Sequence, residues 1–525
     1  MHTSPARGAE PRPEAGDDTA PVVRWDRVDA AVVVVAAIAT VFLHPIHLVL
    51  SRPYWVDEAW VATLTRLPWS RMARLSSSTP VAFVGLLKLV PGSGLQRARI
   101  VVLVFSAASA AMAYVLARAM RWRSLLHARL AGVTAALTVM LSPVSLGRND
   151  LKQYTCDAFC ALTVLVVAMR ADRRPGRAPV VWLGVTALLV LPFSSTSAFV
   201  SAAAFGGLIG SALLTRSWRR AAEIGVIGAV AGAVLGVYFG GVIVANTNAH
   251  LREFWHNFYL GGAPWHILRV TASRLSTLAP ALGMPAAVFI VLFILGIAAL
   301  ARRRERAVAI ALPVLWIEMM AAGRLRRYPF LDLRTSHFLL VSSMVVIAVG
   351  VFDLVQAAHR RNAAPGITVG LVLAGAFVAS AAPDVREVRI PYEDVRSQTV
   401  YVAQHRKQAD VILVNSPGNF GFSYYWPHGP IQAIDFDSGQ GFQARVAGLD
   451  AALYVPLRTY DSIYTTLRDA DARRRANGAQ SRLFIVRTHM SHAESDLWNH
   501  AIAALHLRPR KVVIGRDTML VVGPR

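Results

Sequence analysis

Residues 54–60 read Tyr-Trp-Val-Asp-Glu-Ala-Trp and follow directly on the first long apolar run of the chain, about where that run must leave a lipid bilayer. Two adjacent carboxylates, Asp57 and Glu58, stand between Trp55 and Trp60. Tryptophan is enriched at membrane–water boundaries, whereas an acidic group at that depth is costly and usually has a task or a partner. The stretch therefore indicates either a functional acidic pair at the membrane surface or, more simply, solvated loop charges with aromatic anchors.

Composition places this stretch in a polytopic membrane protein. Of 525 residues, 54% are hydrophobic and only 16% are charged, with a mean hydropathy of +0.43, whereas a soluble protein is about a quarter charged. The net charge is +24, but the arginines punctuate apolar runs, which is a signal of membrane topology. Because no basic stripe is interleaved with aromatic residues, we expect no nucleic-acid partner.

Apolar runs that could form transmembrane helices of about twenty residues recur along the chain. They lie at about 29–50, 99–119, 129–146, 155–170, 179–193, 196–215, 222–245, 284–301, 307–323, 336–356 and 366–382, which predicts about 11 helices. As one helix, 179–215 would be roughly 55 Å long, against a hydrocarbon core of about 30 Å. Because Pro-Phe-Ser-Ser-Thr-Ser at 192–197 offers a turn, we expect two helices there.

Arginine placement predicts the orientation of these helices. If the N-terminus is cytoplasmic, the inner loops carry the arginine clusters at 118–123, 170–177, 216–220, 302–306 and 360–361, which is the positive-inside pattern. The outer face then holds the loops at about 51–97, 147–154, 246–283 and 324–334. The last of these is as basic as the inner loops, so either it pairs with an anion or the predicted topology fails there.

Composition also divides the chain into three parts. Residues 1–28 are polar and read as a disordered cytoplasmic tail, and 29–383 form the transmembrane domain. From 384 to 525 polar residues rise and no spanning run remains, which predicts a soluble extracytoplasmic α/β domain. Strands are expected at 409–414, 482–486 and 511–515, with a helix at 460–477.

Carboxylates at the membrane boundary, basic side chains on neighbouring loops and aromatic rings around them suit one kind of chemistry. Arginine and lysine hold a phosphate, and arginine can do so with a bidentate fork. A carboxylate takes the proton from an attacking hydroxyl. Glycosyl transfer from a polyprenyl-phosphate sugar to an acceptor hydroxyl, by direct attack with inversion, is the reaction that fits.

Three motifs resemble the GT-C superfamily of integral membrane glycosyltransferases, with bacterial relatives of the protein O-mannosyltransferases and of the aminoarabinose (lipid A) transferases the most similar. They are residues 55–58 (Trp-Val-Asp-Glu), Thr79-Pro80 with the helical run to Lys88, and 148–154 (Arg-Asn-Asp-Leu-Lys-Gln-Tyr). In that family an acidic pair follows the first helix and a charged segment opens the fourth. Residues 328–330 (Tyr-Pro-Phe) with Arg334, ahead of a late helix, also resemble it. Many relatives carry a double proline where this chain has Thr79-Pro80. This difference counts against the subfamily assignment and not against the superfamily.

The resemblance implies a polyprenyl-phosphate-dependent hexosyl- or pentosyltransferase with an outward-facing site. Asp57 would be the general base, Glu58 its neighbour or orienter, and Asp150 a second acid near the acceptor or a metal. The basic residues that would hold the donor phosphate are Lys152 with one or more of Arg148, Arg324, Arg327 and Arg334, each of which could instead contact lipid headgroups. The residues that would line the substrate are Trp55, Trp60, Tyr154 and Tyr328.

The sequence says less about a metal cofactor, the binding partners and the functional class of the protein. No histidine or cysteine spacing resembles a tetrahedral metal site; some relatives use a divalent cation, but this sequence demands none. The expected partners are the bilayer of the cell membrane, the lipid-linked donor, and a glycan, lipid or protein acceptor. A transporter or flippase of lipid-linked glycans would more often show paired halves with interrupted helices, which are not found. A membrane-anchored sensor is the third class.

Overall fold

The computed structural model describes residues 25–76, 78–90, 96–244, 249–361, 363–387, 392–436, 441–515 and 517–524. Most of the predicted disordered tail, residues 1–24, therefore lies outside the described residues. The first helix begins at Arg27, two residues before the predicted start of the transmembrane domain at 29, and the side chain of Asp26 accepts the N–H of Asp29 in a capping box.

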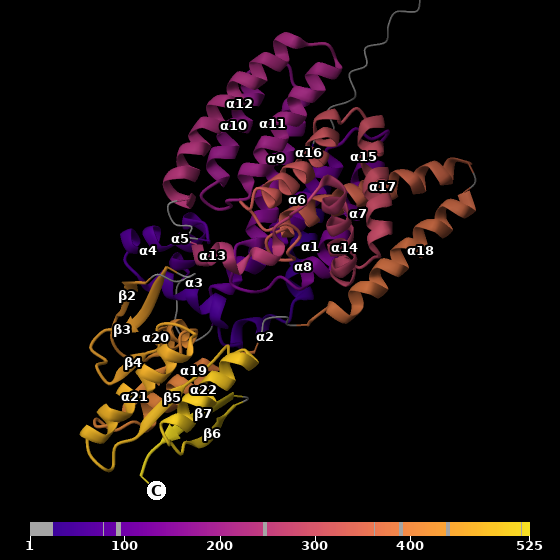
Figure 1. The fold of residues 1–525 in the computed structure, drawn as a ribbon. Helices are drawn as coiled ribbons and strands as arrows, with labels where there is room; N and C mark the ends of the chain where they lie inside the picture. The colour runs from indigo at the N-terminus through magenta and orange to yellow at the C-terminus, as the bar shows by residue number, and fades with distance from the viewer. Residues whose placement is uncertain are drawn as a thin grey trace, which may run out of the picture.

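The part of the chain up to residue 384 is helical (Figure 1). Its helices are α1 (Arg27–Leu43), α2 (Ile46–Ser51), α3 (Val56–Arg66), α4 (Trp69–Leu75), α5 (Val81–Leu89), α6 (Arg99–Arg118), α7 (Leu125–Leu141), α8 (Pro143–Leu146), α9 (Tyr154–Arg173), α10 (Ala178–Val190), α11 (Ser197–Leu214), α12 (Trp218–Tyr238), α13 (Ala249–Phe254), α14 (Pro264–Leu282), α15 (Ala286–Arg302), α16 (Arg306–Arg324), α17 (His337–Arg361) and α18 (Ala363–Ala381).

Each of the eleven predicted apolar runs overlaps a helix, and the break within 179–215 is confirmed by the separation of α10 from α11. Six helices among the described residues are long and apolar enough to cross a membrane, or seven if α14 and α15 count as one broken span. The shorter α7 and α10 are apolar but fall below that length. The protein is thus a helical chain with several candidate spans, and the total of eleven stays a prediction.

Prolines and a glycine explain where the predicted runs are wrong. The run at 29–50 divides into α1 and α2 at Pro45, and the run at 129–146 divides into α7 and α8 at Pro143, because proline lacks the N–H that a continuing helix needs. The predicted loop at 246–283 contains the amphipathic helix α14. It meets α15 at 89°, and Gly283 at the bend has a φ of +68°.

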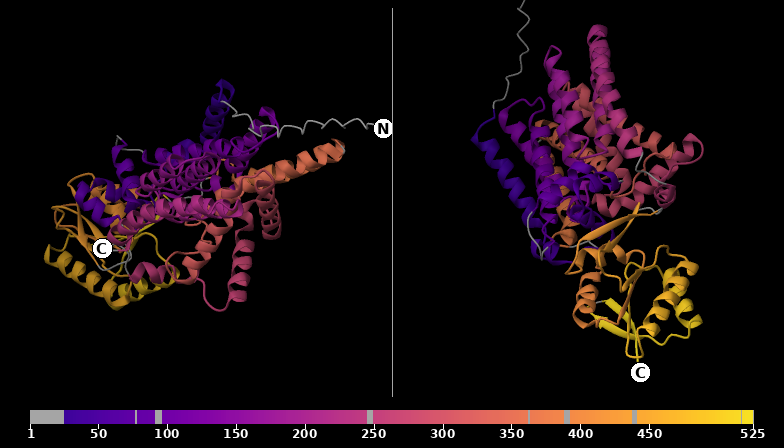
Figure 2. Two further views of the ribbon diagram at one scale, coloured as in Figure 1. Left: turned by 90° about the horizontal axis from the view of Figure 1, so that it is seen from above. Right: turned by 90° about the vertical axis from the view of Figure 1, so that its left-hand side faces the viewer.

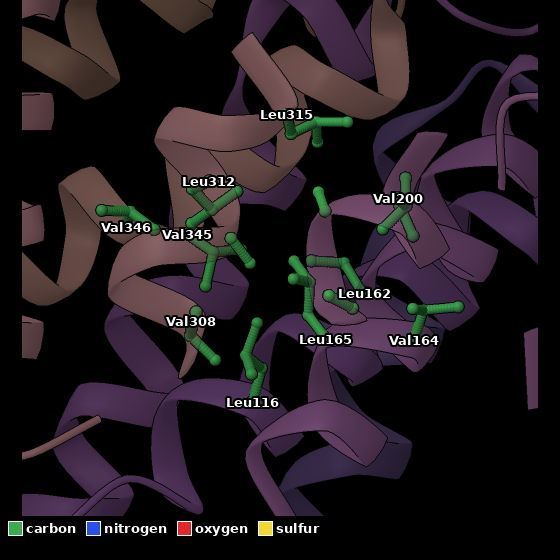
Figure 3. Close-up of a cluster of buried hydrophobic side chains, with 14 of the residues drawn as sticks. Leu116, Leu162, Val164, Leu165, Val200, Val308, Leu312, Leu315, Val345 and Val346 are labelled. Carbon is green, nitrogen blue, oxygen red and sulfur yellow. The ribbon is translucent and has the colours of Figure 1, made fainter. Parts of the chain in front are cut away.

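The core of the helical part is built around α9, whose apolar stretch is 78% buried, against 11% for α12. Leu162 and Leu165 of α9 face Leu116 of α6, Leu312 of α16 and Val345 of α17 (Figure 3). Glycines let neighbouring helices approach closely: a Cβ on Gly296 of α15 would lie 2.3 Å from the carbonyl oxygen of Val346. The charged segment at 147–153 therefore directly precedes α9, the most buried of the candidate spans.

The C-terminal part is an α/β fold, as predicted. Its elements are α19 (Val395–His405), β1 (Val411–Val414), α20 (Gly418–Tyr425), β2 (Ile431–Asp435), β3 (Phe442–Val446), β4 (Ala452–Tyr454), α21 (Tyr460–Ala476), β5 (Leu483–Val486), α22 (His492–Ala504), β6 (Arg510–Ile514) and β7 (Asp517–Val522). The sheet has the order β4-β1-β5-β7-β6, with β1 parallel to β4 and β5 and with β7 antiparallel to β5 and β6. The three predicted strands and the predicted helix are confirmed.

The C-terminal part lies at one end of the helical part, where α20 packs against α3 (Figures 1 and 2). One hydrophobic cluster is shared across this boundary. It joins Ala59 and Trp60 of α3 and Phe83 of α5 to Phe420 of α20 and Phe442 of β3. The helix that carries the acidic pair is therefore packed between the two parts of the chain.

Candidate active site

Glu58 is fully buried and connects its own helix α3 to the start of α6 and to the segment before α9. The Nε of Arg99 donates to its Oε1 at 2.8 Å, and the Nη2 of Arg99 donates to its Oε2. The backbone N–H of Leu151 donates to Oε1 at 2.6 Å, and that of Trp55 to Oε2 at 3.3 Å. Glu58 thus caps α3 and fixes the segment that carries Asp150 and Lys152. Both carboxylate oxygens of Glu58 are therefore occupied by donors of the protein itself.

Arg99, which the sequence analysis missed, is the counter-ion that makes this burial tolerable. It lies at the start of α6, is fully buried, and donates from Nη1 to the carbonyl oxygens of Val49 at 2.6 Å and Arg52 at 2.7 Å. Its Nη2 also donates to the carbonyl of Pro53 at 3.1 Å. A buried ion pair of this kind is stable only when its remaining donors and acceptors are satisfied. The only feature of the sequence that could have identified Arg99 is its position as a charged residue at the start of an apolar run.

Asp57, the next residue to Glu58, faces the opposite environment. Its side chain is 35% exposed, and its Oδ2 accepts from Nη1 of Arg334 at 3.2 Å. Successive residues of a helix point about 100° apart, so the Glu58 carboxylate is buried against α6 while that of Asp57 faces Arg334, in the segment before α17. Asp57 is therefore the member of the pair that a substrate can reach.

The segment 148–153 adds a basic and an acidic group beside Asp57. Lys152 is buried, and its Nζ lies 4.7 Å from the centre of the Trp60 ring. Burial lowers the pKa of Lys152, and the neighbouring Asp57 carboxylate opposes this shift. Asp150 is also buried, and its Oδ1 lies 4.0 Å from Nη1 of Arg148.

Arg334 comes from the basic segment that broke the predicted charge rule. The Oδ1 of Asp332 accepts the N–H groups of Arg334 at 3.1 Å and Thr335 at 3.0 Å, which fixes the turn before α17. The guanidinium lies 5.6 Å from the centre of the Trp255 ring and reaches Asp57. Asp332 and Trp255 are thus further candidate site residues. Within the basic segment Arg334 pairs with Asp57 of the protein itself, whereas Arg324 and Arg327 are exposed.

The aromatic residues predicted to line the substrate lie around this cluster. Trp60 is under Lys152, and Tyr154, the first residue of α9, is buried close enough to Arg334 and Asp150 to interact with both electrostatically. Trp55 is packed 6.0 Å from the ring of His489 in the C-terminal part. Tyr328 donates its hydroxyl to the carbonyl of Thr335 at 3.0 Å and so supports the Arg334 turn.

Two of the predicted phosphate ligands lie apart from Asp57. Arg324 and Arg327 are exposed at the end of α16 and just beyond it. Arg327 lines a depression of about 430 Å³ near the surface. Its other lining residues are Arg252, Glu253, His256, Tyr259, Leu325 and Arg326. The sequence analysis grouped these arginines with Arg334 because they are neighbours in the chain, but residues 328–333, which are mostly buried, lie between them.

The sequence left a divalent cation open, and the carboxylates around Asp57 are paired with arginines. No group of three or more His, Cys, Asp or Glu side chains among the described residues is arranged to hold a metal ion. Asp57 and Asp332 are each within 4 Å of Arg334, and Asp150 is at that distance from Arg148, so each carboxylate already has a cationic neighbour. A cation bound here would have to displace one of these arginines, and the use of a divalent cation stays a prediction.

The fold matches solved structures of an oligosaccharyltransferase from the archaeon Archaeoglobus fulgidus. One of them, in complex with Zn and sulfate, aligns with a TM-score of 0.52 and 14% identity over 86% of this chain and 67% of that chain. Another, AglB in complex with an inhibitory peptide and a dolichol-phosphate, aligns with a TM-score of 0.52 and 12% identity over 87% and 69%. The chain has the GT-C fold. It spans about two thirds of the length of these GT-C proteins.

The GT-C resemblance stated from the sequence motifs is thereby confirmed at the level of the fold. No protein-family model matches the chain, and no curated protein matches it. At 12–14% identity the match to these structures shows the fold and does not identify the donor or the acceptor of this chain. The likeness to protein O-mannosyltransferases and aminoarabinose transferases stays a prediction.

Proposed function

We propose that the protein is a membrane glycosyltransferase that moves a sugar from a polyprenyl-phosphate donor to an acceptor hydroxyl on the extracytoplasmic face. The observation that carries the proposal is the accessible Asp57 carboxylate, 3.2 Å from Arg334 and beside Lys152, with Glu58 buried behind it. One base and two cations at one point are what transfer from a lipid phosphate needs. The GT-C fold supports the same reading.

In the proposed reaction Asp57 accepts the proton of the acceptor hydroxyl as its oxygen attacks the anomeric carbon. The bond from that carbon to the phosphate oxygen breaks, and polyprenyl phosphate leaves as an anion held by Arg334 and Lys152. Direct displacement with no enzyme nucleophile inverts the anomeric configuration. Donor phosphate would also compete with Asp57 for Arg334, so that donor binding releases the base for catalysis. Asp150 is the second acid near the acceptor.

The outer cluster of Arg324 and Arg327 is proposed as a secondary contact for the anionic donor, reached past Trp255. The bilayer, the lipid-linked donor and a glycan, lipid or protein acceptor are the partners of this function. The N-terminus is placed in the cytoplasm and residues 384–525 outside, on the positive-inside pattern of the loops.

The direct test offers purified protein a panel of polyprenyl-phosphate hexoses and pentoses labelled in the sugar, with candidate acceptors. A transferase moves the label to an acceptor and inverts its anomeric configuration, and Asp57→Asn abolishes the transfer while donor binding persists. Arg71→Ala, which removes an exposed ion pair with Asp435, is the matched control and should keep its activity. Label that crosses a vesicle membrane while still on its lipid would mark a flippase instead, and a retained anomer would exclude the single displacement.

A further inference from the structure

The segment that leads into Asp57 has its backbone held from two sides. From the membrane side, Arg99 accounts for the carbonyls of Val49, Arg52 and Pro53. From the other side, three residues of the C-terminal part bind the same segment. Arg396 Nη1 donates to the carbonyl of Ser51 at 3.2 Å, Tyr425 accepts the N–H of Tyr54 at 2.8 Å, and Glu393 accepts the N–H of Val56 at 3.0 Å.

Glu393 makes the contact nearest to Asp57. Val56 is the first residue of α3, and the N–H groups of a first helical turn have no partner within the helix. Glu393 Oε2 supplies that partner, and a carboxylate is also favoured at the positive end of the helix dipole. Its Oε1 lies 2.6 Å from Nδ1 of His489, which packs on Trp55. The side chain is only 14% exposed, so it is held in this position.

We propose that Glu393 is a positioning residue for Asp57, through which the C-terminal domain holds the first turn of α3 at the angle that catalysis requires. The proposal rests on the function proposed for Asp57. Glu393 touches no reacting atom and acts through the N–H of the residue before the base. A shift of about 1 Å in a reacting group can cost about a hundredfold in rate, so a loosened first turn is enough to slow the reaction.

The rest of the boundary allows this role to be separated from simple docking. Arg71 and Arg74 pair with Asp435 at 3.0 and 2.9 Å, and Thr63 donates to the carbonyl of Phe420 at 3.2 Å. With the shared hydrophobic cluster these contacts hold the C-terminal domain on α3 and α4 without Glu393. Asp435→Asn removes ion pairs between β2 and α4, in the same boundary, and is the matched control.

Amide hydrogen exchange of the full-length protein in lipid nanodiscs tests the positioning without any substrate. In Glu393→Ala the amides of residues 56–58 should exchange about tenfold faster, as expected for a lost helix cap, while residues 81–89 and 418–425 keep their rates. Glu393→Gln retains an acceptor oxygen and should behave as wild type, and so should Asp435→Asn. Unchanged exchange at 56–58 in Glu393→Ala, or equal acceleration across both parts of the chain, would overturn the proposal.

Kinetics with whichever labelled polyprenyl-phosphate sugar gives turnover provides the second readout. Glu393→Ala should lower kcat about tenfold with little change in donor KM, because the phosphate ligands Arg334 and Lys152 are untouched, and Glu393→Gln should restore most of the rate. Wild-type kcat in Glu393→Ala, while Asp57→Asn is inactive, would overturn the positioning proposal alone. Full turnover by Asp57→Asn would instead overturn the proposed function.

Discussion

Asp57 and Glu58 are neighbours in the chain, yet their carboxylates have opposite surroundings. The side chain of Asp57 is 35% exposed and bonds to Arg334, whereas that of Glu58 is fully buried and bonds to Arg99. The first is open to exchange its cation for a substrate, and the second has its acceptors taken by Arg99 and by the N–H groups of Trp55 and Leu151. Under the proposed function, one acidic pair would therefore supply both the reacting carboxylate, Asp57, and the buried carboxylate that holds its helix in place, Glu58.

The first prediction separates these two roles by substitution. Asp57→Asn should lose nearly all transfer, a fall of about 10²–10⁴-fold, while its melting temperature stays near that of wild type. Glu58→Gln should instead destabilise the protein by about 3–5 kcal/mol, because it leaves Arg99 as an uncompensated buried charge. Thermal unfolding in detergent and a transfer assay measure the two effects. Equal destabilisation by both substitutions would contradict the division of roles.

The second prediction concerns the donor phosphate. Arg334→Ala and Lys152→Ala each remove a charge-assisted hydrogen bond, worth about 1.5–3 kcal/mol, so the donor KM should rise by roughly 10–100-fold with a smaller change in the acceptor KM. Arg74→Ala, an exposed arginine that pairs with Asp435, is the control and should keep both constants. Wild-type donor affinity in both site variants would place the phosphate elsewhere, with Arg324 and Arg327 as the next candidates.

The third prediction is a pH dependence at Lys152. Burial lowers the pKa of this lysine below its ordinary value of 10.5, so its positive charge is present at low pH and is lost as the pH rises through the lowered value. Donor KM should therefore rise on the alkaline side at a lower pH than an exposed lysine would cause. Lys152→Arg should remove that rise, because arginine keeps its charge. An unchanged alkaline limb in Lys152→Arg would assign the titration to another group.

The fourth prediction is the orientation in the membrane. Cysteines introduced at Arg123, in the exposed loop between α6 and α7, and at Ala479, an exposed position after α21, should react with an impermeant thiol reagent from opposite sides. The native Cys156 and Cys160 are buried and provide a low background. Intact cells should label only the position at 479. Labelling of both positions in intact cells would contradict the predicted number of spans between them.

Much of the architecture could be predicted from the sequence, because it depends on local properties. A run of apolar residues forms a helix in lipid wherever it lies in the chain, since the bilayer leaves backbone groups no other partner. The turn at 192–197 and the strands at 411–414 and 483–486 follow from equally local signals. The helix α14 was missed because it is amphipathic, so polar and apolar residues are interspersed along the chain and no continuous apolar run marks it.

From residue type and order alone, the acidic pair, residues 148–154 and Arg334 could be grouped as one candidate site. Which carboxylate of the pair is accessible could not be predicted in this way, because it depends on Arg99, 41 residues from Glu58, and on Arg334, 277 residues from Asp57. The contact of Glu393 with Val56 spans 337 residues. Such pairings are set by how helices and domains pack against each other. The local sequence around a residue does not indicate which distant residue it will contact.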